Sequence, residues 1–447
     1  MKRLVLAFAF LAVVACTSES NFPNPTGKGT VRAINAMSAS PEVGFFIVER
    51  RIGQAGSQEV TATTRWDDFG YVFNFEVSFP GEITARRIAS SMQKIDAGRD
   101  YTFVLTGDVE APIVSVWEGS EREWDGSETV FEVRFANVAE QDSLLGLIDV
   151  YLAPDGTAPV AGEQIATLDF GEIMPAIDME AVEYVLTLTR AGDPMDILFQ
   201  SRPATFVAQT AVIAPIFDVD ERETASLNVL AINTLGPSVR FVDTDADPTI
   251  RFVQASLDLP DSDVYDDDMQ TNLILTDHVF GDITDDIPIS SGTTTHYYTP
   301  AGEISPVLFE GDITARKNSH WNWLVVGREG DRFASTYIPT RRSISIYAQV
   351  STFHAAFNNQ EIDLYVVDAG LPIDDANPAF FSMRYTFSLR TLNFAAGSYD
   401  LYATLPGEKT ILGGPVTIDV VDGDVVEIML FDMVDPAVVD IRILPPQ

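Results

Sequence analysis

The sequence predicts an all-β protein built from tandem antiparallel β-sandwich domains, of the immunoglobulin-like or transthyretin-like kind. Apolar and polar residues alternate along many short segments, as strands with one buried face require, and helical periodicity is scarce. Two sequence phrases also recur about every hundred residues. A unit of that length with frequent turn residues is typical of a two-sheet sandwich.

The first recurring phrase is a strand-like segment that ends in a turn glycine. It reads FEVSFPGE, YVLTLTRAGD, HYYTPAGE and LYATLPGE along the chain. The glycines are Gly81, Gly192, Gly302 and Gly407, so successive copies lie 111, 110 and 105 residues apart. Glycine adopts the positive φ of such turns at little cost. The nearly constant spacing predicts four copies of one domain.

The second recurring phrase is an Asp-Val-Tyr strand. It reads DVYLAPDG in the second unit, DLYVVDAG in the fourth and, more weakly, DVYDDD in the third, while FFIVE takes its place in the first. Alternation places Val150 and Leu152 on the core face. Asp149 and Tyr151 are expected on the opposite face. Because the phrase weakens and disappears between copies, it indicates a structural strand and not a shared active-site motif.

Each unit is expected to open with a strand and to close with a return strand. The opening strands are VRAINA, FEVRFANV, IRFVQAS and IYAQVSTF. The return strands are DYTFVLTG, TFVAQTAVI (residues 205–213), HWNWLVVG and DVVEIMLF. These segments predict sandwich repeats over residues 30–118, 129–236, 249–342 and 344–447.

The N-terminus resembles that of a bacterial lipoprotein. A short basic start precedes an apolar run over residues 4–14, which is shorter than the roughly 20 residues of a transmembrane helix. The run closes with VVAC, similar to a lipobox, and Cys16 is the single cysteine. The resemblance implies a signal peptide over residues 1–15 and lipidation of Cys16. Residues 16–29 are expected to form a polar tether. Since Thr17 and not an acidic residue follows the cysteine, the resemblance implies sorting to the outer membrane of a Gram-negative bacterium.

The composition excludes several classes of function. The formal net charge of −38 repels nucleic acid and anionic lipid head groups. A hydrophobic content of 46% argues against disorder as the explanation of that charge. With its one thiol lipidated, the chain can form no internal disulfide and no thiolate metal site.

Taken together, the phrases resemble a bacterial family known only as domain of unknown function 4397. The segments that match are Asp149 to Leu152, Tyr184 to Gly192, Asp363 to Val366, Tyr399 to Gly407, and Gly423 with Asp424. The third unit matches in part, and the first lacks the Asp-Val-Tyr phrase. The resemblance implies tandem β-sandwich domains on exported or lipid-anchored proteins, and it implies no activity.

The sequence contains no nucleophile elbow Gly-x-Ser-x-Gly, no His-Glu-x-x-His and no P-loop. Of its four histidines (His278, His296, His320 and His354), His296 and His320 fall on expected strands of one unit. They could form a metal pair or an acid–base pair. Other units place unrelated residues at both positions, with Asp100 and Asp424 expected to align with His320, so histidines without a chemical task are favoured. We expect no catalytic site and no enzyme.

Acidic residues cluster in DVDERE, DTDADP and DSDVYDDD. Asp243, Asp245 and Asp247 have the alternate spacing of a calcium loop, and Ca²⁺ takes 6–8 oxygen ligands. Pro248 and Gln254 stand where an EF-hand has its glycine and its bidentate glutamate. The alternatives are therefore an irregular calcium site that stiffens the second domain junction and a solvated acidic loop.

The function expected from these observations is that of a non-catalytic, lipid-anchored scaffold or stalk in the cell envelope. The alternative is a surface module that binds a glycan or another envelope protein. Exposed aromatic residues in the variable loops would carry that binding, for example Trp66, Trp117 and Trp124. No cofactor is expected in either case, calcium apart.

Overall fold

The computed structural model describes residues 24–139, 146–233 and 237–444, and every regular element in these ranges is a β-strand. The predicted all-β class is confirmed. The expected signal peptide and Cys16 lie outside the described residues, as does most of the tether. Nowhere in the described ranges is there a helix long and apolar enough to cross a membrane.

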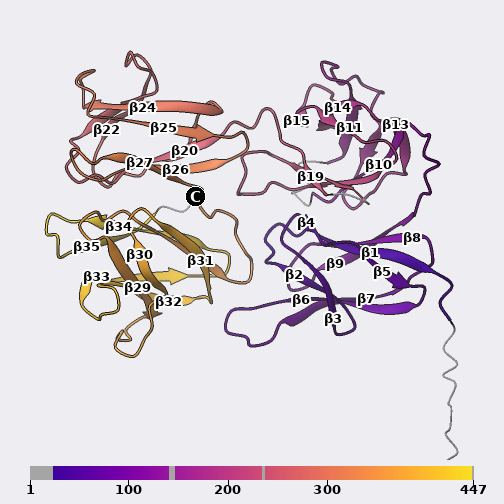
Figure 1. Cartoon of the computed structure of the whole chain (residues 1–447), viewed down its shortest axis with the longest axis horizontal. Helices are drawn as coiled ribbons and strands as arrows, with labels where there is room; N and C mark the ends of the chain where they lie inside the picture. The colour runs from indigo at the N-terminus through magenta and orange to yellow at the C-terminus, as the bar shows by residue number, and fades with distance from the viewer. Residues whose placement is uncertain (1–23, 140–145, 234–236, 445–447) are drawn as a thin grey trace, which may run out of the picture.

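The strands group into four successive units (Figure 1). Unit 1 contains β1 (Lys28–Asn35), β2 (Val43–Ile47), β3 (Arg50–Ala55), β4 (Glu59–Val60), β5 (Thr64–Asp67), β6 (Gly70–Val77), β7 (Arg86–Lys94), β8 (Arg99–Thr106) and β9 (Ile113–Ser120). Unit 2 contains β10 (Val130–Asn137), β11 (Ile148–Ala153), β12 (Ala166–Leu168), β13 (Ile177–Glu180), β14 (Glu183–Arg190), β15 (Ile197–Gln200), β16 (Ala204–Thr205), β17 (Ala211–Phe217), β18 (Asn228–Asn233) and β19 (Val239–Arg240).

The second half of the chain repeats this organisation. Unit 3 contains β20 (Thr249–Gln254), β21 (Ser262–Tyr265), β22 (Leu273–His278), β23 (Ile287–Pro288), β24 (Gly292–Pro300), β25 (Phe309–Ala315), β26 (His320–Val326) and β27 (Phe333–Tyr337). Unit 4 contains β28 (Ala348–His354), β29 (Glu361–Asp368), β30 (Phe380–Arg384), β31 (Ser388–Phe394), β32 (Gly397–Thr404), β33 (Ile411–Val420), β34 (Val425–Asp432) and β35 (Val439–Ile443).

Each unit has two sheets with the same strand order. The first sheet centres on the opening strand beside the return strand, as in β4-β1-β8-β9 and β31-β28-β34-β35. The second centres on the Asp-Val-Tyr strand beside the strand that ends in the turn glycine, as in β12-β11-β14-β15. The two sheets of a unit share one apolar core. In unit 2 this core joins Phe131 and Val133 of β10 to Val150 of β11 and to Leu186 and Leu188 of β14.

One strand pair in every unit departs from the expected antiparallel arrangement. The opening and return strands run parallel: β1 with β8, β10 with β17, β20 with β26, and β28 with β34. Between these two strands the chain builds the second sheet and also adds one or two strands to the other side of the opening strand, namely β4 and β5, β13, β23 or β31. The return strand then enters the first sheet from the same end as the opening strand. A crossover of this length permits parallel pairing, which a hairpin does not.

The expected position of the second return strand was wrong. Residues 205–213 were expected, whereas β17 spans Ala211–Phe217 and Gln209 has a positive φ in the turn before it. This strand is buried on both faces, so it carries a continuous apolar run in place of alternation. The sheet of unit 2 also extends to Arg240 through β19, beyond the expected end at residue 236.

The Asp-Val-Tyr strand alternates as expected, but both of its faces are covered. Val150 and Leu152 belong to the core. Asp149 and Tyr151 lie outside that core and are nevertheless only 2% and 4% exposed. A buried carboxylate requires hydrogen-bond partners, and the contacts of Asp149 explain why the phrase recurs.

The aspartate of the phrase caps the turn that follows the glycine strand. One carboxylate oxygen of Asp149 accepts the backbone N–H of Gly192 at 2.9 Å, and the other accepts the Thr167 hydroxyl. The two later copies repeat the first bond, from Gly302 N–H to Asp263 and from Gly407 N–H to Asp363, both at 2.8 Å. In units 2, 3 and 4 one hydrogen bond therefore joins the two recurring phrases, with the aspartate of one as acceptor and the turn glycine of the other as donor.

The last residue of each opening strand also has one structural task. Four buried side chains accept the backbone N–H two residues further on: Asn35 (3.3 Å), Asn137 (3.1 Å), Gln254 (2.7 Å) and His354 (3.3 Å). The Nε2 of His354 donates to the Asn359 carbonyl at 2.7 Å, so its Nδ1 is the acceptor and the ring is neutral. Burial lowers the pKa of His354 to about 4.

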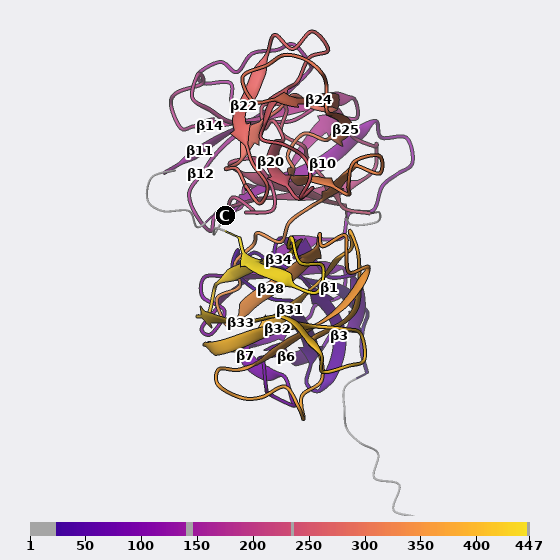
Figure 2. The same ribbon diagram turned by 90° about the vertical axis from the view of Figure 1, so that its left-hand side faces the viewer.

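The units pack in pairs through the outer faces of their first sheets. Ile34 and Val104 of unit 1 meet Ala136 and Phe217 of unit 2. The corresponding strands of units 3 and 4 meet in the same way, through Val253, Leu324, Phe353, Met429 and Phe431. In Figure 1 the pairs stand side by side, and Figure 2 shows units 3 and 4 in front of units 2 and 1.

The last unit also touches the first. The opening strand of unit 4 was expected to begin at Ile346, but β28 begins at Ala348. Ile344, Ile346 and Tyr347 instead pack on the core of unit 1, and the N–H of Ser345 donates to the Ala39 carbonyl at 2.9 Å. Since the Ala225 N–H of unit 2 also donates to Asn318 of unit 3, the four units form a closed ring of contacts.

We predict that Asp149→Ala destabilises unit 2 by about 1 kcal/mol, because the Gly192 N–H and the Thr167 hydroxyl would lose their acceptor in a partly buried site. Hydrogen exchange followed by mass spectrometry should show faster exchange in the peptide that contains Gly192. Asp155→Ala, in the exposed part of the same phrase, is the matched control. Equal exchange in both variants would contradict the capping role of Asp149.

Candidate functional site

A cavity of about 350 Å³ lies between units 1 and 2, next to the apolar contact that joins them. Its wall is made by β1, β8 and β9 of unit 1, by β10 and β17 of unit 2, and by the linker residues 121–124. This volume is in the range of small-molecule sites, which are commonly found between domains.

Arg32 is the most unusual residue of this wall. It is only 4% exposed, and its Nε donates to the Thr102 hydroxyl at 2.9 Å. Its Nη2 is buried and has no hydrogen-bond partner among the residues that the structure describes. Burial lowers the pKa of Arg32, and the charge of Asp100 partly offsets this effect. A buried cation with a free donor favours an anion in the space beside it.

The other arginines of the cavity already have partners. Arg65 forms an ion pair with Glu121 at 3.0 Å. Arg122 pairs with Glu128 at 2.5 Å. Arg134 donates to the backbone, with its Nη1 3.0 Å from the Glu118 carbonyl. Arg32 is therefore the arginine of this wall that keeps a side-chain donor without a partner among the described residues.

Two of the expected aromatic residues line this cavity. Trp117, from β9, is 6% exposed and packs in the apolar contact between units 1 and 2. Trp124, from the linker, is half-buried, and the Arg122 guanidinium lies 3.9 Å from its ring centroid. Trp66 lies in a separate depression of unit 1, below Arg50. The structure thus places Trp117 and Trp124 on one cavity and leaves Trp66 apart. The expectation of exposed aromatic residues in loops was wrong for Trp66 and Trp117, which lie on strands β5 and β9, and Trp117 is buried.

The structure does not bring the two candidate histidines together. His296 lies inside the core of unit 3, edge-on to Phe252 and Trp323 at centroid distances of 4.9 and 5.6 Å. The Nδ1 of His320 instead lies 2.7 Å from the Thr249 hydroxyl, outside that core. The expected alignment of His320 with Asp100 holds, but strand register places Val425, and not Asp424, at the same position in unit 4.

The proposed calcium ligands are divided between different contacts. Asp243 is buried and accepts the N–H of Asp245 at 3.0 Å, and burial raises the pKa of Asp243. Asp247 pairs with Lys317 at 2.5 Å. Within the described ranges, no group of three or more His, Cys, Asp or Glu side chains could hold a metal ion. These three aspartates therefore form no ligand set in this structure.

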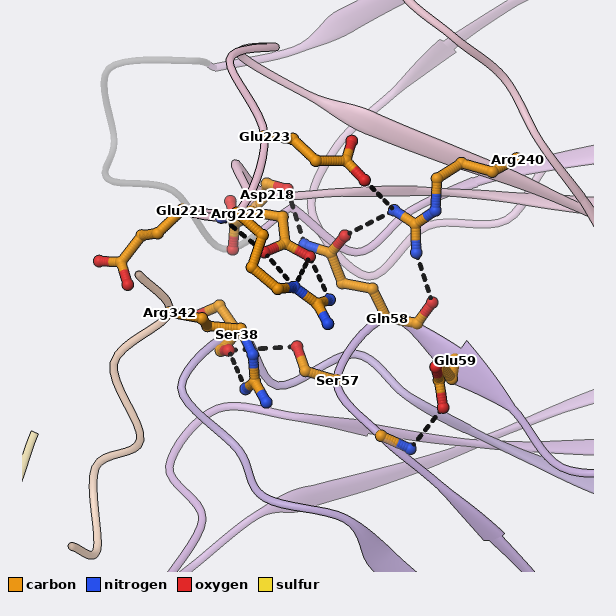
Figure 3. Close-up of polar contacts among 12 residues, drawn as sticks. Ser38, Ser57, Gln58, Glu59, Asp218, Glu221, Arg222, Glu223, Arg240 and Arg342 are labelled. Atoms are coloured by element: carbon orange, nitrogen blue, oxygen red, sulfur yellow. Dashed lines mark hydrogen bonds and ion pairs between the residues drawn. The ribbon is translucent and has the colours of Figure 1, made fainter. Parts of the chain in front are cut away.

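The acidic loop 218–225, between β17 and β18, joins several units (Figure 3). Its Asp218 carbonyl accepts the Gln58 side-chain amide of unit 1 at 2.9 Å. Arg240 of unit 2 donates to the same amide group of Gln58 at 3.2 Å. The Ala225 N–H donates to Asn318 of unit 3 at 2.8 Å.

The linker between units 3 and 4 reaches the same region. The Ser343 N–H donates to the Glu221 carboxylate at 2.6 Å. Arg342, drawn in Figure 3, donates to the Ser38 and Ser40 carbonyls of unit 1 at 3.1 and 2.5 Å. The DVDERE acids thus bind protein groups, and neither of the sequence-based alternatives for acidic clusters, calcium or plain solvation, describes them.

Sequence reasoning missed Arg32 and Thr102, because they alternate with core residues as any outward-facing pair would. One signal was available. Arginine recurs at the same place in three opening strands, as Arg32, Arg134 and Arg251. A charged residue repeated on a strand face is unexpected unless that face carries a specific contact.

Comparisons with known proteins add little. No protein-family model matches the sequence, and no curated protein matches it. The resemblance to domain of unknown function 4397 therefore stays a prediction. A solved structure described as the Bacillus anthracis TIE protein is similar over 91% of this chain and 69% of that chain, at 9% identity and a TM-score of 0.15. A TM-score at this level supports no argument about fold or function.

We predict that unit 3 loses stability as the pH falls from about 6.5 to about 4. Burial lowers the pKa of His296 to about 4, so the unfolded chain takes up the proton first. The linked loss is about 3 kcal/mol for this histidine. Units 2 and 4 have Leu186 and Leu401 at the same register position.

His296→Leu should therefore stabilise unit 3, and more strongly at pH 4.5 than at pH 7.5. Calorimetry at both pH values measures this difference, with Thr293→Val on the exposed part of the same strand as the control. An equal gain at the two pH values would contradict protonation of His296 as the cause.

Proposed function

We propose that the chain is a non-catalytic, lipid-anchored protein of the cell envelope whose four sandwich-like units act as one scaffold. The observation that carries the proposal is the ring of contacts through the loop 218–225 and the unit 3–4 linker. It ties unit 1 to units 2 and 4, and unit 2 to unit 3. Units fixed in this way hold their outer loops in constant relative positions, which favours a scaffold over an extended stalk.

The lipid anchor rests on VVAC and on Cys16 as the single cysteine. Several acyl chains on one cysteine would hold a protein stably at a membrane, whereas one chain binds only marginally. The strongly acidic units would be repelled by anionic head groups. The tether then has a physical purpose, because it lets the units stand away from the lipid surface.

We expect Cys16→Ser to move the protein from the detergent fraction to the aqueous fraction in a phase partition of expressing cells. Metabolic labelling with a palmitate analogue should mark the wild type and not the variant. Thr17→Ser is the control, since it leaves the cysteine in place. Aqueous partition of the wild type would contradict the anchor.

The scaffold makes a separate prediction for the soluble chain that starts at Thr17. Solution X-ray scattering should give a radius of gyration of about 22–25 Å, near the value for a compact chain of this length. A much larger radius, with a pair-distance distribution that shows several separated maxima, would indicate four loosely linked units and would contradict the scaffold.

A second function is favoured by the cavity between units 1 and 2, which is to bind a glycan or a similar small ligand. Trp117 and Trp124 line this cavity, together with Arg32, whose Nη2 has no partner among the described residues. Titration of the soluble chain with a panel of neutral and acidic sugars tests this function. If no sugar of the panel binds, this second function is contradicted and the scaffold is the proposed function that remains.

A further inference from the structure

The contact between units 3 and 4 repeats the contact between units 1 and 2, position for position. In unit 1 the parallel register pairs Arg32 with Thr102, and Thr102 pairs in turn with Trp117. In unit 3 the same register positions hold Arg251, Asn322 and Tyr337. The residues around the cavity in one contact therefore have direct counterparts in the other.

In the contact between units 3 and 4, these counterparts surround a carboxylate. Glu427, from β34 of unit 4, is 4% exposed. It accepts the Asn322 side-chain amide at 3.1 and 3.2 Å and the Tyr337 hydroxyl. Burial raises the pKa of Glu427, while the charges of Arg251 and Arg341 act in the opposite direction. One unit thus inserts an acid among the polar residues of its neighbour.

The contact between units 1 and 2 has no such acid at the corresponding position. Register pairs Ser351 with Glu427 in unit 4 and Arg134 with Ile213 in unit 2, so Ile213 stands where Glu427 stands. Ile213 borders the cavity of about 350 Å³, and so does Arg32, whose buried Nη2 has no hydrogen-bond partner among the described residues. The polar surroundings of a carboxylate are present, and the carboxylate is missing.

Resting on the second function proposed above, we infer that the cavity between units 1 and 2 binds a sugar acid whose carboxylate pairs with Arg32. The carboxylate takes the place that Glu427 fills in the other contact. The sugar ring lies in the part of the cavity lined by Trp117 and Trp124. Its hydroxyls donate to Asp100 and Glu132, which also line the cavity.

The chemistry of the wall favours this class over simpler anions. Asp100 accepts the Thr30 hydroxyl and Glu132 lies 3.6 Å from Arg122, so both acids keep acceptor oxygens for a ligand. A sulfate, with two charges and no donors, would be repelled by these two acids. A sugar acid supplies one anionic group, several hydroxyl donors and an apolar ring face.

Isothermal titration of the soluble chain with galacturonate, glucuronate, glucose and acetate tests the inference. We expect a sugar acid to bind, glucose and acetate to bind far more weakly, and Arg32→Gln to weaken sugar-acid binding by about ten- to hundredfold. Arg99→Gln, an exposed arginine of the same strand as Thr102, should bind as the wild type does.

A second variant, which introduces a carboxylate at position 213, tests the inference even if Arg32→Gln perturbs folding. Ile213→Glu should supply the missing carboxylate internally, abolish sugar-acid binding and melt at a higher temperature than Ile213→Gln. Equal melting of these two variants, or unchanged binding in Ile213→Glu, would overturn the assignment of the site.

The outcomes also separate this inference from the function on which it rests. Binding of glucose as tight as that of the sugar acids, and insensitive to Arg32→Gln, would leave a glycan site and overturn the role of the carboxylate. Absence of binding across the panel would overturn both, and it would leave the scaffold and its scattering test unaffected.

Discussion

The structure depends on covering the outer face of the first sheet in each unit. An ordinary sandwich leaves such a face in water, with polar side chains on it. Here β17 and β34 are buried on both faces over most of their length, and their sequences, AVIAPIF and VVEIMLFD, are apolar nearly throughout. A single unit would expose this surface, which is a cause of aggregation in isolated domains. Face-to-face packing removes two such surfaces from water at once, so the units occur as pairs.

The polar end of each paired face shows a different constraint. A buried arginine must be neutralised or hydrogen-bonded, or its desolvation destabilises the contact. In units 3 and 4 the charge of Arg251 acts on the nearby Glu427 carboxylate, although Nε and Nη1 of Arg251 are buried without hydrogen-bond partners among the described residues. Units 1 and 2 keep an open volume beside Arg32 instead. Two copies of one contact have thus diverged, one toward a closed interface and one toward an accessible space, while their strand register stayed the same.

Much of the fold followed from periodicity, because alternation and turn glycines are local signals. The existence of an opening strand in every unit and the core face of Val150 and Leu152 were predicted correctly from them. Alternation failed at β17, whose second face is covered by another unit, and no local signal reports such a covering. The parallel pairing of opening and return strands was missed for a similar reason, since it depends on how two distant strands meet.

The site could be predicted only in part. Trp117 and Trp124 were noticed because tryptophans at a junction are conspicuous, but their common cavity depends on the angle between two units. His354 illustrates the opposite case. Asn, Gln and His make equivalent hydrogen bonds at the ends of the opening strands, so the sequence varies where the structure does not.

The contact of Ile344 and Ile346 with unit 1 has a consequence for the order of folding. A ribosome delivers unit 1 first, and 224 residues after its last strand (120 to 344) it delivers the segment that completes the hydrophobic cluster of unit 1. Contacts so distant in sequence form late, because loop closure must precede them. The hydrophobic cluster of unit 1 therefore stays incomplete until the segment that contains Ile344 and Ile346 has been synthesised. A chain interrupted before residue 344 leaves an apolar patch on its first unit, where a chaperone or a neighbouring copy of the chain would bind.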